Sequence, residues 1–184
     1  LYKQYIQLRP KDELGYVGLG DTEYLAAGDG DQAIAIWTAG RKKVGDSMTL
    51  LLRIAEAQAN SSQFDELKNT LSDVEKSIQQ LDQGNDRQRN WAVASMSLFR
   101  GKMLLAERQP LAAIPHLKSA ANFGNPNGRD RVGQNRSIAF SAWTALGETY
   151  RELDRAKDAA DAFDHALELK PNHEATVLAS AEAW

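Results

Sequence analysis

One stretch of the sequence, 143–171, constrains the fold more than any other part of the chain. It places large apolar side chains and small residues at helical spacing, in two blocks followed by a proline. The residues of this pattern are Trp143, Leu146, Gly147, Tyr150, Ala159, Phe163, Ala166 and Pro171. Small residues at a crossing let two antiparallel helices approach closely, and aromatic side chains fill the space around them. The stretch therefore predicts a helical hairpin.

This series of residues resembles the tetratricopeptide repeat along its full length. The resemblance implies an all-α fold, a right-handed superhelical solenoid of antiparallel helix pairs, and a role in binding proteins or peptides. Pro171 cannot continue the helix that it follows, so it separates this repeat from the next. Trp143, Tyr150 and Phe163 are interpreted as core residues and not as a cofactor site.

Weaker copies of the same pattern lie upstream in the chain. One copy consists of Gly101, Leu104, Ala113, Leu117 and Ala120. Another consists of Tyr16, Leu19, Gly20, Ala33 and Trp37, and its spacing is one residue longer. We expect the extra residue in the turn at 27–31. A degenerate copy between these two, around 54–74, is assigned because the period requires it.

The period divides the chain into repeats, and we expect a single solenoid over 1–184 that is a fragment of a longer array. The expected repeats are 13–46, 47–85, 86–123 and 139–173. Two partial repeats are expected at the ends, the second helix of a preceding repeat at 1–12 and the start of a further helix at 174–184. The segment 124–138 breaks the period and is predicted to be an irregular connection or a helix extension.

The segment 124–138 is also locally basic, because it contains Arg129, Arg131 and Arg136. Two interpretations stay open for these side chains. They are part of a solvated loop that Asp130 partly neutralises, or they serve an acidic partner or nucleic-acid phosphates.

The composition limits the classes of function. A chain of 184 residues that is 42% hydrophobic and 26% charged is typical of a soluble globular or solenoid protein. Its formal net charge of −3 gives no general attraction to nucleic acid or anionic membranes, so neither is expected as a partner. No signal peptide or membrane-spanning run of about 18 apolar residues indicates a compartment. The absence of cysteine excludes disulfides and a thiol nucleophile.

No motif in the sequence predicts catalysis, so we expect no enzyme activity, no cofactor and no metal. No two of the three histidines, His116, His165 and His173, have the four-residue spacing of a helical zinc site. The glycine-containing stretch 28–31 lacks the lysine and the preceding strand of a phosphate-binding loop. We interpret it as a turn between two helices.

The resemblance implies a concave groove, lined by the first helices of successive repeats, in which the family binds peptide segments. Helical geometry and the family's orientation predict which residues point into it. These residues are Val17, Asp21, Tyr24, Leu52, Arg53, Glu56, Leu98, Lys102, Thr144, Glu148 and Arg151. Apolar side chains and carboxylates alternate along this surface, with Lys102 as the exception. Such a surface favours a peptide with basic and apolar residues, unless the charges are only a hydrated helix face.

Some members of the family hold the acidic C-terminal tail of a heat-shock chaperone with lysine and asparagine side chains on the same inner faces. This chain has Val17, Asp21, Leu52 and Glu56 where that clamp should begin. Because acidic residues would repel a carboxylate, a chaperone tail is disfavoured as the partner.

Three functions fit these observations. The first is a protein–protein interaction scaffold that binds a partner segment in the groove. The second is a self-assembly module that stacks through its ends, where Tyr2, Tyr5 and Trp184 would otherwise face water. The third is a regulatory interaction segment of a larger multidomain protein.

Overall fold

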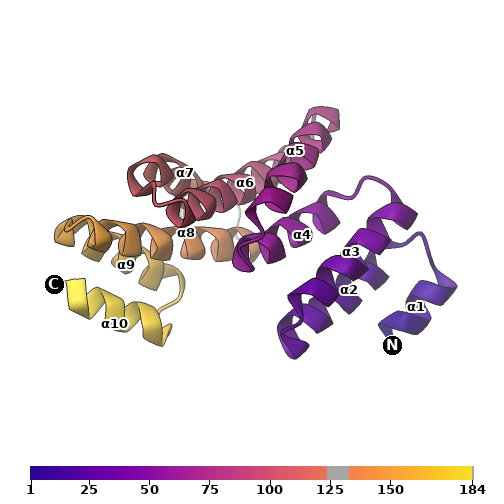
Figure 1. Cartoon of the computed structure of the whole chain (residues 1–184), viewed down its shortest axis with the longest axis horizontal. Helices are drawn as coiled ribbons and strands as arrows, with labels where there is room; N and C mark the ends of the chain where they lie inside the picture. Colours follow the sequence, from indigo (N-terminus) through magenta and orange to yellow (C-terminus); the bar gives the residue numbers. More distant parts are fainter. Residues whose placement is uncertain (124–132, 184) are drawn as a thin grey trace. The chain divides into compact units, whose positions relative to one another are not determined.

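The computed structural model describes residues 1–123 and 133–183, and every secondary-structure element in these ranges is a helix (Figure 1). The chain forms two compact units, unit 1 over 1–85 and unit 2 over 86–184. In each unit consecutive helices pack against one another. Short connections make such neighbours antiparallel. The predicted all-α fold, built from repeated antiparallel helix pairs, is therefore confirmed.

Unit 1 contains five α-helices and one π-helical turn. They are α1 (Tyr2–Leu8), α2 (Glu13–Thr22), η1 (Glu23–Ala27), α3 (Gly30–Val44), α4 (Met48–Asn60) and α5 (Phe64–Gln80). Three helices begin at a side chain that caps their first turn. The side chains of Asp12, Asp29 and Ser47 accept hydrogen bonds from the backbone N–H groups of Leu14, Gln32 and Leu50. Such caps satisfy N–H groups that have no partner inside the helix, and each stabilises its helix by about 1 kcal/mol.

The extra residue of the first repeat is absorbed at the end of α2, and not only in the following turn as the sequence suggested. The π-helical turn η1 continues α2 directly over Glu23–Ala27. A π-helix bonds residue i to residue i+5, so one such turn accommodates one additional residue. Gly28 then ends the turn in the left-handed conformation, at φ 70°, which favours glycine.

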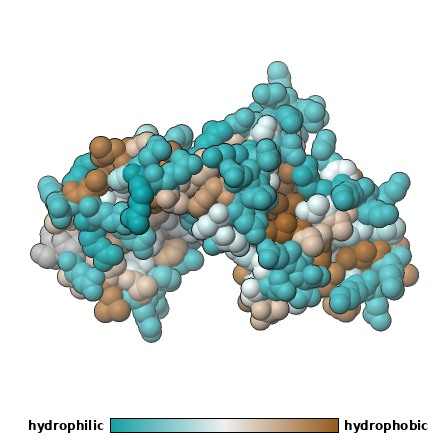
Figure 2. All heavy atoms as spheres, in the orientation of Figure 1, coloured by the Kyte–Doolittle hydropathy of each residue, from teal (hydrophilic) through white to brown (hydrophobic). Residues whose placement is uncertain are grey.

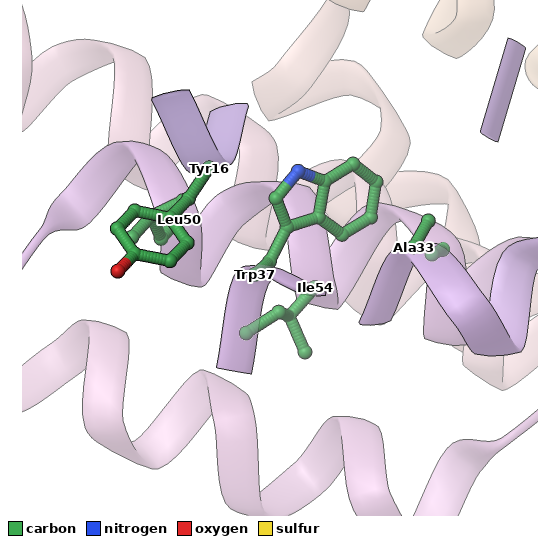
Figure 3. Close-up of a cluster of buried hydrophobic side chains, with 6 residues drawn as sticks. Tyr16, Ala33, Trp37, Leu50 and Ile54 are labelled. Atoms are coloured by element: carbon green, nitrogen blue, oxygen red, sulfur yellow. The ribbon is translucent and has the colours of Figure 1, made fainter. Parts of the chain in front are cut away.

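The core of unit 1 is built around the indole of Trp37, which is fully buried (Figure 3). Tyr16, Ala33, Leu50 and Ile54 belong to the same cluster of buried side chains. Gly20 lies directly beneath the indole, because a Cβ atom there would overlap Nε1 of Trp37. The glycine of the repeat pattern thus makes room for the large side chain of the second helix.

The described residues of unit 2 form five helices, and in its two complete pairs the first helix is longer than the second. They are α6 (Asp86–Ala106), α7 (Pro110–Phe123), α8 (Gly133–Glu152), α9 (Ala156–Leu169) and α10 (Glu174–Ala183). The packing of glycine against a large side chain recurs twice. A Cβ atom on Gly101 would lie 2.5 Å from Leu117, and one on Gly147 would lie 2.5 Å from Phe163.

Helix α8 begins well before the repeat pattern does, at Gly133. Arg136, in this extension, donates a hydrogen bond from Nε to the backbone oxygen of Leu169, at 2.9 Å. That carbonyl belongs to the last turn of α9, where backbone oxygens have no partner inside the helix. Arg136 therefore has a structural role at the end of α9, whereas Arg129 and Arg131 lie outside the described residues.

Candidate functional site

The first helices of unit 1, α2 with its extension η1 and α4, are joined by polar contacts at their surface, and two of these involve residues that the sequence placed in the groove. The guanidinium of Arg53 lies 3.0 Å from Oδ2 of Asp21. At the C-terminal end of α4, Nδ2 of Asn60 donates a hydrogen bond to the hydroxyl of Tyr24, at 2.6 Å. Arg53 also lies 3.5 Å from Glu56 on its own helix. These five residues, which we call the α2–α4 seam, include four that the sequence placed in the groove.

The seam carries one more negative than positive charge, because Asp21 and Glu56 share the single guanidinium of Arg53. Burial raises the pKa of Asp21 above its usual value, and the charge of Arg53 lowers it by less. The side chain of Asp21 is 25% exposed, so water solvates its carboxylate only in part. An ionised carboxylate in such a place favours an additional cationic neighbour.

We expect the Asp21→Asn substitution to change the free energy of unfolding by less than about 1 kcal/mol at pH 7, because desolvation of the carboxylate outweighs its attraction to Arg53. Since the folded-state pKa is raised, Asp21 adds stability that is fully present below its usual pKa of 3.8 and lost as the pH rises through the raised value. Urea unfolding at several pH values measures this difference. A loss above about 2 kcal/mol at pH 7 would show that the ion pair is a net stabiliser.

A row of residues on α2 and η1, of which Leu14 and Leu25 are exposed, borders the seam. Leu14 is 64% exposed and Leu25 is 76% exposed, and Gly18 and Asp21 lie between them in the sequence. Spacings of four, three and four residues place all four on one side of the helix. We call this row the α2 strip. The sequence analysis missed Leu14 and Leu25, although their spacing from Asp21 was the signal that would have found them.

Two of the residues that the sequence predicted to line the groove have buried side chains, so they cannot contact a ligand. Leu52 is 3% exposed and Leu98 is 5% exposed. Helix α4 packs against α2, α3 and α5, and α6 packs against α7 and α8. Val17 is partly buried and packs against the core of unit 1. The apolar patches expected from Leu52 and Leu98 are therefore not available to a partner, and Val17 offers only part of its surface.

Unit 2 has a related arrangement between α8 and α10. Arg151 on α8 lies 3.1 Å from Glu182 on α10, so a charged pair again joins two first helices. Glu148 is exposed on α8. Thr144 donates its hydroxyl hydrogen bond to the backbone oxygen of Phe140, at 2.9 Å, and Lys102 is partly buried on α6.

Among the described residues, no group of three or more histidine, aspartate or glutamate side chains is placed to hold a metal ion. The imidazole of His165 packs against Trp143 at 4.5 Å between ring centroids, and that of His173 meets the ring of Phe140 edge-on at 4.8 Å. None of the helices in the described part of the chain combines the length and apolar character needed to cross a membrane.

Hydrophilic residues cover most of the surface drawn in Figure 2, and apolar residues appear there as separate patches. Single exposed apolar side chains are ordinary on protein surfaces. The α2 strip differs from them because two large exposed leucines and a partly buried carboxylate share one helix face.

No family model matches the chain, and no curated protein matches it. Among solved structures, the chain is similar to YrrB, a TPR protein with an unusual peptide-binding site. The sequences are 14% identical, the TM-score is 0.48, and the similarity covers 98% of this chain and 97% of YrrB. It is also similar to the APC/C hetero-tetramer Cut9–Hcn1, with 15% identity and a TM-score of 0.49. That similarity covers 99% of this chain but only 38% of the matched chain.

Proposed function

We propose that this chain is a protein–protein interaction scaffold that binds a peptide segment of a partner in the groove lined by its first helices. The observation that carries the proposal is the α2–α4 seam, where two carboxylates share one guanidinium beside exposed apolar side chains. In unit 2, the pair of Arg151 and Glu182 and the exposed Glu148 supply a second polar surface on first helices.

The charge of these surfaces indicates the kind of peptide that binds. Asp21 and Glu56 leave one uncompensated negative charge on the seam, which attracts a lysine or arginine of the partner. The same carboxylates repel an acidic tail. The partner segment therefore combines basic with apolar residues, and a chaperone tail stays disfavoured.

A selection from a random peptide library tests this proposal. We expect the chain to select peptides that carry basic and apolar residues. The double charge reversal Asp21→Lys and Glu56→Lys should weaken their binding at least about tenfold, because these positions would then repel the basic residues of the peptide. Raising the salt concentration should weaken binding to the original chain as well. Fluorescence anisotropy with the selected peptides measures both effects.

The matched control reverses two carboxylates on a second helix, Asp65→Lys and Glu66→Lys in α5. Both lie on the first turn of α5 and are exposed, and Asp65 is 97% exposed. Circular dichroism establishes that both double variants remain helical. If no peptide is selected, or if the two variants lose binding equally, first-helix recognition in unit 1 is wrong.

A further inference from the structure

The first helices of unit 2, α8 and α10, carry the same kinds of side chain as the α2–α4 seam and its neighbour Leu25. The guanidinium of Arg151 on α8 lies 3.1 Å from the carboxylate of Glu182 on α10. Glu148 is exposed and lies three residues before Arg151, one helical turn away. Leu178 is 65% exposed and lies four residues before Glu182. We call these four residues the α8–α10 surface, and its two carboxylates and one guanidinium leave one net negative charge.

The corresponding residues of unit 1 follow one another in the opposite direction along their helices. Glu56 lies three residues after Arg53, and the guanidinium lies between this carboxylate and that of Asp21. Leu25, which is 76% exposed, lies four residues after Asp21. The arginine is on the later first helix in unit 1, α4, and on the earlier one in unit 2, α8.

These differences are those of a local rotation. First helices run parallel, because each is antiparallel to the second helix between them. Rotating two parallel helices by half a turn about an axis perpendicular to their surface exchanges the helices and reverses their direction. Each surface therefore offers the same four groups in the same order, and the direction of the helices beneath them is reversed.

The spacing on each surface fits two alternate residues of an extended chain. Four residues of helix separate Asp21 from Leu25 and Glu182 from Leu178, which is about 6 Å along the axis. In an extended chain, residues i and i+2 point to the same side and lie about 6.6 Å apart. A segment with a basic and an apolar residue at these two positions thus places a cation beside the carboxylates and an apolar side chain on the exposed leucine.

We propose that each unit binds one extended segment with the pattern basic-x-apolar, or the same pattern in the reverse chain direction, so that one chain binds two copies of the motif. The partner is therefore a protein that carries this motif twice. The two bound copies run in opposite directions relative to the first helices beneath them. This proposal rests on the proposed function and adds to it the motif, the number of sites and the class of partner.

The test is a nitrogen-15 NMR titration of the complete chain with short synthetic peptides, because this method detects weak binding and locates it. The first peptide is Ser-Gly-Arg-Ser-Leu-Gly-Ser, the second has its sequence reversed, and a third has glutamate in place of arginine. We expect the first or the second peptide to shift the amide signals of both surfaces with similar affinity. The third should bind at least about tenfold more weakly, because the carboxylates repel it.

Charge reversals separate the two sites. Asp21→Lys with Glu56→Lys should weaken binding at least about tenfold at the seam and leave the α8–α10 surface unchanged. Glu148→Lys with Glu182→Lys should do the opposite. The matched control for unit 2 is Asp161→Lys with Glu168→Lys, two exposed carboxylates on the second helix α9, and it should change neither site.

A second pair of variants keeps every charge. Leu25→Ser and Leu178→Ser remove exposed apolar surface, so neither should disturb the fold, and each should weaken binding only at its own surface. Peptides with two copies of the motif, joined by glycine–serine linkers of about 10, 20 and 30 residues, should bind at least about tenfold more tightly than one copy at one or more of these lengths.

Four outcomes overturn the proposal. If library-selected peptides bind but the short peptides shift the signals of one surface or of neither, the paired sites fail and the proposed function stands. If no peptide of either kind binds, both fail. If no tandem peptide binds more tightly than a single copy, a partner with two copies is wrong. If sedimentation shows self-association of the original chain that the charge reversals at both surfaces abolish, the occupant is a second copy of this chain.

Discussion

Replacing Gly20 by alanine should destabilise unit 1 by about 3 kcal/mol or more. The added Cβ atom would overlap Nε1 of Trp37, and the indole has nowhere to move because it is fully buried. Tyr24 packs edge-on against the indole at 5.7 Å between ring centroids, which closes that side as well. Urea unfolding followed by far-ultraviolet circular dichroism measures the loss.

Gly30→Ala is the control for this substitution, because it adds the same methyl group to a helix of the same unit. The nearest neighbour of a Cβ atom on Gly30 is Oγ of Ser61, at 3.4 Å, so the change should be neutral or stabilising by up to about 1 kcal/mol. If Gly20→Ala costs no more than Gly30→Ala, the close packing of α2 against the indole is not rigid. Combining Gly20→Ala with Trp37→Leu should recover part of the loss, because leucine leaves room for the methyl group.

The helix pairs could be predicted from the sequence because their packing depends on residues at fixed spacing within one repeat. Gly147 and Phe163 are 16 residues apart, and so are Gly101 and Leu117. Each pair places a small residue of the first helix under a large residue of the second. A local pattern of this kind is visible in the sequence, since one side chain determines what the other must be.

The π-helical turn could not be predicted, because the sequence records an extra residue but not where the backbone absorbs it. The segment after α2 ends in Gly28, Asp29 and Gly30, which is typical of a longer loop. In the structure the wider turn is formed while Tyr24 contacts both Trp37 and Asn60. The π-helical turn therefore makes contacts with α3 and α4, and these helices lie outside the segment whose sequence was interpreted.

The candidate site was predictable only in part for a related reason. Helical spacing placed Asp21 and Arg53 on the same surface, and they form an ion pair. The exposure of an apolar residue depends instead on which side of its helix the neighbouring helices cover. Helices α2 and α4 each have three neighbouring helices, but Leu52 of α4 is buried, whereas Leu14 of α2 and Leu25 of η1 are exposed. The period of a single helix does not contain that information.

Replacing Phe163 by alanine should destabilise unit 2 by about 3–5 kcal/mol. The phenylalanine is fully buried, and its ring lies over Gly147, where a Cβ atom would be 2.5 Å from the ring. The cost should fall at the upper end of this range, because Gly147 has no side chain that can move into the cavity. Denaturant unfolding monitored by circular dichroism gives the free energy.

The substitution Phe163→Leu shows whether the loss comes from the cavity or from any change of this side chain. Leucine occupies the equivalent place opposite Gly101, as Leu117, and is fully buried there. It should therefore cost only about 1–1.5 kcal/mol at Phe163. Asp161→Ala, an exposed change on the same helix, should lie within about 0.5 kcal/mol of the original chain. Equal losses for the alanine and leucine variants would mean that α8 and α9 close around the smaller side chain, and the glycine would not fix their separation.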